Sequence, residues 1–251
     1  MISTKSPEEL EFMHRANSIV LKVLEELRER AKPGVSTGDL DDHAHERIRQ
    51  EGVRSAFLGY RDFPKVLCAS VNEEIVHGIP SSRKILKEGD IVGLDFGVVV
   101  EGFFGDSAIT VPVGAIPEET RKLLEVTEDS LRCAIETMRP GNHISDISRA
   151  VQTRVESDGY SIVRDFVGHG IGTAMHEDPP VPNYVMGGRD IRLVEGMVLA
   201  IEPMVNIGRP EVVIESDSWT ARTADRSLSA HFERSVAVTA NGPRVLGEEA
   251  A

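Results

Sequence analysis

Residues 86–95 read LKEGDIVGLD, and residues 193–202 read LVEGMVLAIE. The second stretch repeats the first at an offset of 107 residues, and each ends an apolar run with an acid, Asp95 or Glu202. Pro-Gly pairs and short apolar strands also recur by chance, but a register that holds from residue 32 to residue 95 favours internal duplication. The other aligned pairs are Lys32-Pro33-Gly34 with Arg139-Pro140-Gly141, Asp39-Leu40 with Asp146-Ile147, Arg47-Ile48 with Arg154-Val155, and Gly52 with Gly159.

The duplication predicts two half-domains of like topology, about residues 1–112 and 113–251, within a single domain that spans residues 1–251. Halves related by a pseudo-two-fold axis create a central cleft, and each half would deliver an acidic residue to it. Carboxylates that face each other repel unless a cation or a shared proton lies between them. We therefore expect a cation site between the halves.

The apolar periodicity predicts two pairs of helices, each followed by strands. Ser6, Pro7 and Glu9 form an N-cap, a first-turn proline and a capping-box acid, so a long helix begins at Pro7 and ends before Pro33. Because helices and strands do not alternate one by one along the chain, the pattern indicates an α+β fold rather than repeated βαβ units. The other expected helices cover about residues 37–51, 117–138 and 145–157, and the expected strands cover about 66–72, 91–100, 103–111, 161–166, 197–206 and 232–239.

Composition limits the classes of function. The 251 residues carry a net charge of −13, which argues against nucleic acid as the main partner because phosphate contacts need clustered Lys and Arg. Two cysteines without a CxxC spacing predict neither a disulfide framework nor a structural zinc, and they indicate a reducing compartment. No run approaches the roughly 20 apolar residues of a membrane span. We expect a cytoplasmic protein with no membrane partner.

Two aspartates lie in the stretch IVGLDFGVVVEGFFGDSAITV, residues 91–111. Glu101-Gly102 marks a turn, and a turn centred between Val100 and Glu101 would place Asp95 directly opposite Asp106, with Cβ atoms about 5 Å apart on one face of the hairpin. Either aspartate alone could be a solvated strand residue. The pair in an apolar strand is instead expected to share a cation, because burying a lone charge is costly.

Further candidate ligands occur in three short segments. The glycine-rich stretch VGHGIGTAMHEDPP carries His169 and His176, AIEPM carries Glu202, and HFERS places Glu233 at the opening of the last expected strand. Each has a structural alternative, such as a buried histidine or a salt bridge from the acid to Arg234 or Arg226. Together, imidazole and carboxylates suit two hard or borderline divalent cations.

The ordered motifs resemble the type I, bacterial-type methionine aminopeptidases of the M24 metallopeptidase family. The resemblance runs from about Ser6 to Leu246, and it implies the pita-bread fold, in which two pseudo-two-fold-related halves share a curved antiparallel sheet with outer helices. The motifs that carry it are His77-Gly78-Ile79-Pro80, Asp95, Gly105-Asp106, Gly168-His169-Gly170-Ile171-Gly172, His176-Glu177, Ile201-Glu202-Pro203-Met204 and Phe232-Glu233.

The family implies a role for each matched residue. Two divalent ions, Co, Mn, Fe or Zn, would be held by Asp95, Asp106, His169, Glu202 and Glu233. Water attack activated by the two ions would remove the initiator methionine of nascent polypeptides that have a small second residue. Glu202 would accept the proton of the water, and His77 and His176 would contact the scissile amide. The resemblance also implies a monomer that acts close to the ribosome.

The methionine pocket would combine His77 and His176 with Tyr60, Phe63, Cys68, Met175 and Trp219, although each of these could equally pack in a core. Four positions depart from the common family pattern. Phe57 replaces a smaller residue, Arg61 a frequent histidine, Met175 an aromatic residue and His231 a glutamine. These departures leave the expected metal ligands intact and change the expected shape of the pocket.

Other functions remain open at this stage. A prolidase or Xaa-Pro aminopeptidase shares the fold and ligand types but usually carries a large N-terminal domain, for which a helix starting at Pro7 leaves no room. A non-catalytic pita-bread binding protein would be expected to have lost ligands, and all five are present here. Four acids with one matched histidine are the wrong balance for an iron oxygenase of the two-histidine, one-carboxylate type.

Overall fold

The computed structural model describes residues 2–188 and 190–249. Its centre is a nine-stranded antiparallel sheet in the order β1-β4-β5-β14-β9-β7-β8, with β2 also paired to β4 and β15 to β14. The strands are β1 (Arg54–Ser55), β2 (Leu67–Val71), β4 (Ile91–Val100), β5 (Phe103–Pro112), β7 (Gly168–Gly170), β8 (Glu177–Val181), β9 (Val198–Ile201), β14 (Glu233–Thr239) and β15 (Gly242–Val245).

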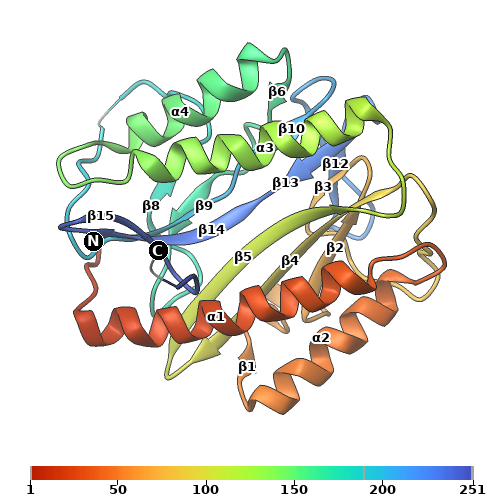
Figure 1. Ribbon diagram of the computed structural model, residues 1–251, viewed down its shortest axis with the longest axis horizontal. Coiled ribbons are helices and arrows are strands. Elements are labelled where there is room, and N and C mark those ends of the chain that lie inside the picture. The colour runs from red at the N-terminus through yellow and green to blue at the C-terminus, as the bar shows by residue number, and fades with distance from the viewer. Residues whose placement is uncertain (1, 189, 250–251) are drawn as a thin grey trace.

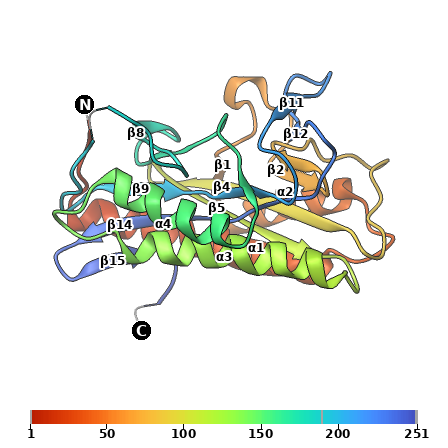
Figure 2. The same ribbon diagram turned by 90° about the horizontal axis from the view of Figure 1, so that it is seen from above.

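Four helices cover one face of this sheet. Helices α1 (Pro7–Arg30) and α2 (Thr37–Glu51) lie over the N-terminal strands, and α3 (Glu118–Glu136) and α4 (Ile144–Ser157) lie over the C-terminal ones (Figure 1). The opposite face carries the segments around β8, β11 (Val212–Ile214) and β12 (Ala221–Thr223) (Figure 2). No helix in the described part of the chain is long and apolar enough to cross a membrane.

Two small sheets complete the fold. One has the order β13-β10-β6 and contains Ser229–His231, Met204–Asn206 and Ser161–Ile162; the other has the order β11-β12-β3, in which β3 is Glu74–Val76. A 3₁₀ turn, η1 (Tyr60–Asp62), precedes β2.

The predicted helices are confirmed to within two residues at most ends because their signals are local. The Ser6 hydroxyl accepts the backbone N–H of Glu9, and the Glu9 carboxylate accepts the Ser6 N–H at 2.7 Å, which is the predicted capping box. Ser36 and Asp39 form the same arrangement at the start of α2.

Equivalent contacts recur at the offset of 107 residues. Ser36 forms an isolated antiparallel bridge with Ile85, and His143 forms one with Arg192. The N–H of Gly34 donates to the carbonyl of Leu86 at 2.8 Å, and the N–H of Gly141 donates to the carbonyl of Leu193 at 3.0 Å. The sequence repeat therefore coincides with a repeat in backbone geometry.

The predicted register of the first hairpin is wrong by two residues. Val100 pairs with Phe103, so the turn is Glu101-Gly102, and Asp95 lies opposite Ala108 while Asp106 lies opposite Gly97. Glu101 and Gly102 have φ of 50° and 84°, the left-handed pair typical of a two-residue I′ turn, whose twist matches the strands. Because the error is an even number of residues, both aspartates stay on one face as diagonal neighbours.

Three predicted strands have different limits. The expected strand 197–206 is interrupted at Glu202-Pro203, so β9 stays in the large sheet and β10 joins a small one; proline has no N–H to continue a ladder. The strand expected over 161–166 ends at Ile162. Glu233 does open β14, but β15 follows it, so β14 is not the last strand.

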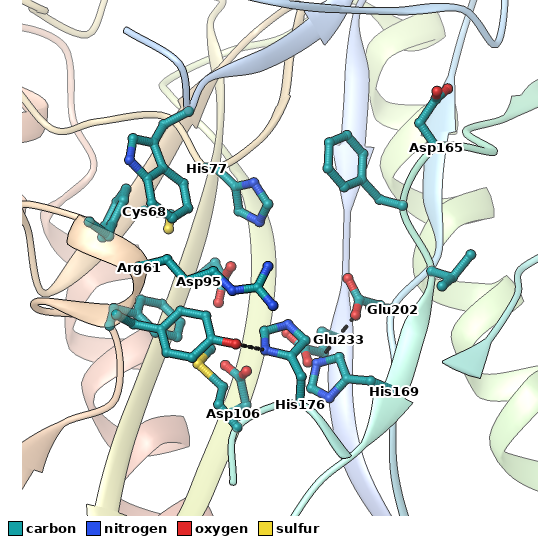
Figure 3. Close-up of a pocket in the computed structure, with 17 residues that line it drawn as sticks. Arg61, Cys68, His77, Asp95, Asp106, Asp165, His169, His176, Glu202 and Glu233 are labelled. Carbon is teal, nitrogen blue, oxygen red and sulfur yellow. Dashed lines mark hydrogen bonds and ion pairs between the residues drawn. The ribbon is translucent and has the colours of Figure 1, made fainter. Parts of the chain in front are cut away.

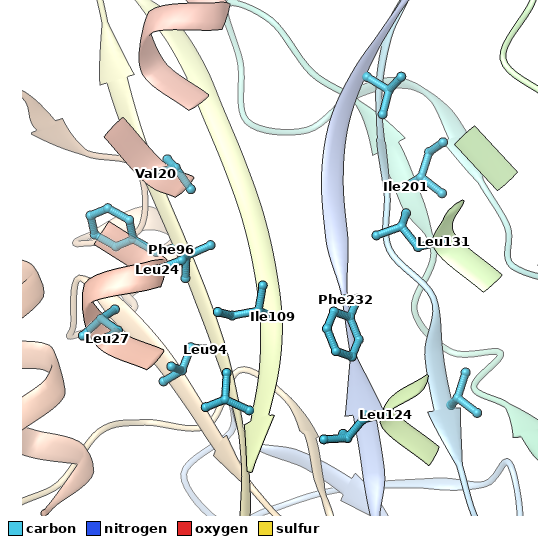
Figure 4. Close-up of a cluster of buried hydrophobic side chains, with 14 of the residues drawn as sticks. Val20, Leu24, Leu27, Leu94, Phe96, Ile109, Leu124, Leu131, Ile201 and Phe232 are labelled. Carbon is cyan, nitrogen blue, oxygen red and sulfur yellow. The ribbon is translucent and has the colours of Figure 1, made fainter. Parts of the chain in front are cut away.

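The core separates the helices from the site. Alternate residues of β4, such as Leu94 and Phe96, pack with Val20, Leu24 and Leu27 of α1. Figure 4 shows this cluster together with a second group of buried side chains beside α3. The second group consists of Leu124, Leu131, Ile201 and Phe232. Since successive strand residues point to opposite faces, Asp95, between Leu94 and Phe96, is directed away from the helices.

Candidate active site

A cavity of about 290 Å³ lies on the face of the sheet that the helices leave open. All twelve residues predicted from the sequence as ligands, catalytic groups or pocket walls line it (Figure 3). They are Tyr60, Phe63, Cys68, His77, Asp95, Asp106, His169, Met175, His176, Glu202, Trp219 and Glu233. Strands β4, β5, β7 and β14 and the end of β9 contribute the five expected metal ligands.

The acidic side of the cavity is a candidate metal centre. Ligand atoms of Asp106, His169 and Glu233 lie within 4.8 Å of one another, and all three residues are buried. Asp95 and Glu202 line the same cavity but do not belong to that closest group. Within the described residues, one carboxylate oxygen each of Asp95, Asp106 and Glu233 is buried without a hydrogen-bond partner. Buried, unpartnered carboxylates fit a divalent cation.

Burial and mutual repulsion raise the proton affinity of these acids. Burial raises the pKa of Asp95 from 3.8 to about 7. Burial, followed by the charges of Glu233 and Asp95, raises the pKa of Asp106 well above its usual value, and burial also dominates the raised pKa of Glu202 and Glu233. Such a cluster would hold protons, or cations in their place, to avoid like-charge repulsion.

His169 is oriented as a neutral ligand. Its Nδ1–H donates to the carbonyl of Gly170 at 2.9 Å, so Nε2 keeps its lone pair and faces Glu202 Oε1 at 3.6 Å. Burial and the neighbouring His176 lower the pKa of His169 to about 4. A neutral imidazole with its other nitrogen bonded to a carbonyl is typical of metal-binding histidines.

His231 lies close to the second carboxylate oxygen of Glu202, whereas His169 faces the first. Its Nε2 is buried without a hydrogen-bond partner in the described residues and is 3.7 Å from Glu202 Oε2. Burial lowers the pKa of His231 to about 3. The β13–β10 pairing of His231 with Met204 brings it there, which its position in the sequence alone does not indicate.

His77 and His176 also line the cavity, and the His176 ring centroid lies 4.2 Å from that of His169. His77 has φ of 61°, and its ring meets those of Phe166 and Trp219 edge-on at 5.4 and 5.9 Å; burial lowers its pKa to about 4. His176 Nδ1 is hydrogen-bonded to the Tyr60 hydroxyl at 2.8 Å, and the two rings stack. Burial and then the charge of Arg61 lower the pKa of His176. Both rings are therefore neutral near pH 7.

An apolar wall adjoins the polar groups. Phe57, Phe63, Cys68 and Met175 are buried together, and Trp219 packs edge-on against Phe63 with ring centroids 5.0 Å apart. Cys68 pairs directly with Asp95 across β2 and β4. Burial and the charge of Asp95 raise the pKa of the Cys68 thiol, so it is a small neutral group rather than a thiolate.

Sequence reasoning missed one wall of the cavity. Asp165, Phe166 and Val167 line it from the loop before β7. The sequence instead predicts a strand through Phe166. The only available signal was an aromatic residue immediately before the VGHGIG stretch. Phe57 and Arg61, noted as departures from the family pattern, also line the cavity.

The model of metallopeptidase family M24 matches residues 11–240. The chain belongs to this family. It is 49% identical to a methionine aminopeptidase of Clostridium acetobutylicum, over 98% of each chain. The crystal structure of the methionine aminopeptidase from Thermotoga maritima matches with a TM-score of 0.97 and 43% identity, covering 99% of this chain and 100% of that one. The prediction of an M24 peptidase with the pita-bread fold is confirmed.

A prolidase from Pyrococcus furiosus matches with a TM-score of 0.77 at 22% identity, and the alignment covers 66% of that longer chain. This likeness concerns the fold alone. It agrees with the sequence-based expectation that prolidases share the curled antiparallel sheet and outer helices.

Proposed function

We propose that this chain is a methionyl aminopeptidase that removes the N-terminal initiator methionine from polypeptides with a small second residue, using two divalent cations. The observation that carries the proposal is the direct contact of two unlike regions in one cavity. Buried acids and neutral histidines adjoin a pocket of aromatic, thiol and thioether groups. Such a pocket suits a long, unbranched, polarizable side chain. The near full-length identity to methionine aminopeptidases supports the same assignment.

The residues that would hold the cations are Asp95, Asp106, His169, Glu202 and Glu233. The unpartnered carboxylate oxygens of Asp95, Asp106 and Glu233 and the lone pair on Nε2 of His169 support this assignment. Oxygen and imidazole ligands are compatible with Mn, Fe, Co or Zn. When bound, such cations polarise a carbonyl and lower the pKa of water.

Glu202 would serve as the proton acceptor. Water adds its oxygen to the carbonyl carbon of methionine, and Glu202 takes up the proton that this water releases. The carbon–nitrogen bond then breaks, and Glu202 returns the proton to the departing amine of residue two. Burial raises the pKa of Glu202, so this carboxylate takes up a proton more readily than an ordinary glutamate.

His77 and His176 would bind the scissile amide as neutral hydrogen-bonding groups. The Tyr60 hydroxyl lies 2.8 Å from Nδ1 of His176, and with this hydroxyl as donor the ring would keep its Nε2–H for the substrate. Neutral donors placed beside the carbonyl oxygen stabilise the negative charge that develops there. Because this part of the cavity is enclosed by rings, a long second side chain would obstruct the approach of the amide.

Cleavage of three peptides by metal-loaded enzyme tests the proposal: Met-Ala-Ser, Met-Leu-Ser and Ala-Pro-Ser. We expect release of methionine from Met-Ala-Ser at a kcat/KM at least about 10²-fold above the other two, because a side chain that blocks the productive pose costs several kcal/mol. Preference for Ala-Pro-Ser would instead support an Xaa-Pro peptidase on the same fold.

We further propose that the chain acts as a monomer in the cytoplasm, close to the ribosome that supplies its substrates. Analytical ultracentrifugation tests the oligomeric state, and co-sedimentation with ribosomes tests the contact. Both measurements are independent of the peptide assay.

A further inference from the structure

Arg61 stands at the mouth of the cavity in a strained turn. It is exposed to solvent and also lines the cavity. Gly59, Arg61 and Asp62 have φ of 80°, 48° and 69°, a left-handed backbone that arginine rarely adopts. Backbone hydrogen bonds fix the turn: Gly59 N–H donates to Phe63 O at 2.8 Å, and Phe63 N–H donates to Tyr60 O at 2.9 Å. Strain of this kind persists only where the surroundings hold it, and such residues tend to cluster at active sites and ligand-binding positions.

The Arg61 guanidinium is an unpaired cation. It lies 5.4 Å from the centre of the Tyr60 ring, and no carboxylate forms an ion pair with it within the described residues. Figure 3 shows it directed toward the middle of the cavity, between Asp95 and His176, whereas the carboxylate of Asp165 points away on the far wall. Its charge contributes to the lowered pKa of His176, which agrees with this placement.

A peptide bound for methionine removal must leave the cavity past this group. The methionine side chain occupies the apolar wall and the scissile amide lies between His77 and His176, so the third and fourth residues emerge at the mouth. This step rests on the proposed function. The protein as a whole is strongly acidic, with a net charge of −13, and this overall charge would attract cationic peptides.

We propose that Arg61 is a specificity-determining residue that favours substrates with an acidic side chain at the third or fourth position. A carboxylate there forms a charge-assisted hydrogen bond with the guanidinium, and a lysine at the same position is repelled. The recognised chemistry is thus an acidic residue close behind the processed end of a polypeptide.

The test uses metal-loaded enzyme and peptides of the form Met-Ala-Xaa-Gly-Gly-Trp, in which Xaa is Glu, Gln or Lys. The measured quantity is the ratio of kcat/KM for Glu to that for Lys. We expect this ratio to fall about threefold in Arg61→Gln, within the range for an exposed ion pair, and about tenfold in Arg61→Glu, where the reversed charge also repels Glu and attracts Lys. The control Arg30→Gln removes an exposed arginine from the end of α1 and should leave the ratio unchanged.

Two further measurements keep the inference open to refutation if a variant folds poorly. Raising the salt concentration should lower the Glu/Lys ratio of the wild type, because screening weakens the contact. In peptides that carry Glu or Lys at the sixth position instead of the third, the Glu/Lys ratio should no longer depend on Arg61. An unchanged Glu/Lys ratio in both Arg61 variants, or a wild-type ratio insensitive to salt, would overturn the inference. Cleavage of the Gln peptide in that case would still support the proposed function. Failure of the wild type to cleave any of the three peptides would overturn both.

Discussion

Replacing Asp95 by asparagine is expected to stabilise the metal-free protein while destroying its response to metal. Burial raises the pKa of Asp95 from 3.8 to about 7. The folded state therefore holds the proton to higher pH than the unfolded chain, and its contribution to stability, complete below about pH 4, is lost as pH rises toward 7. That interval corresponds to about 4 kcal/mol of unfolding free energy. An asparagine side chain at this position cannot ionise and avoids this loss, although its amide is only partly satisfied.

The assay compares urea unfolding of chelator-treated wild type and Asp95→Asn between pH 4 and pH 8. We expect the variant to be more stable at pH 8 by about 2–4 kcal/mol, which corresponds to roughly 4–16 °C in Tm for a chain of this size. Added Mn or Co should raise the Tm of the wild type by mass action and leave that of the variant nearly unchanged.

Asp41→Asn is the matched control. Asp41 is also buried, but its carboxylate accepts hydrogen bonds from Lys65 Nζ at 2.8 Å and from the N–H groups of Val66 and Leu67 at 3.1 and 3.3 Å. We expect this substitution to destabilise the protein by about 1–3 kcal/mol. If Asp95→Asn destabilises the metal-free protein in the same way, Asp95 is a satisfied structural acid and the reasoning is refuted.

Three other substitutions separate further roles. His77→Ala should keep the metal-induced rise in Tm but lower kcat by about 10²-fold, measured on Met-Ala-Ser; loss of the Tm response would make His77 a ligand. Tyr60→Phe removes the 2.8 Å hydrogen bond to His176 and should lower kcat about fivefold with little change in Tm, as expected for one hydrogen bond; unchanged kcat would exclude a positioning role. Lys5→Met breaks the 2.6 Å contact with Glu177 beside the His176 loop and should cost about 1–3 kcal/mol by urea unfolding, whereas a cost near zero would show that the N-terminal segment does not hold this loop.

The parts of the fold that depend on local chemistry could be predicted from the sequence. Capping residues and apolar periodicity located α1 and α2, and the offset of 107 residues located the repeated Pro-Gly turns. The hairpin register could not be read off reliably, because it depends on the left-handed angles of Glu101 and Gly102. The break after Ile201 depends on the strand leaving one sheet for another at Pro203, and neighbouring strands decide that change.

The membership of the candidate site could be predicted from the sequence, but its geometry could not. Ordered motifs assembled residues from distant segments, and all twelve line one cavity. Their relative distances required the fold: Asp106, His169 and Glu233 form the closest group, whereas His231 reaches Glu202 only through its pairing with Met204. Phe166 lies in a loop without periodicity, so its contact with His77 could not be predicted from the sequence. The metal and catalytic roles of these residues stay predictions.

Titration of metal-free enzyme with Mn or Co, with methionine release from Met-Ala-Ser and bound metal measured on the same samples, tests the central claim most directly. We expect no release in the presence of chelator, and activity that rises with bound metal up to two ions per chain. The variant Asp106→Asn should bind less metal and release methionine in proportion. Full methionine release by enzyme without metal, or metal binding at two ions per chain with no release, would contradict the account.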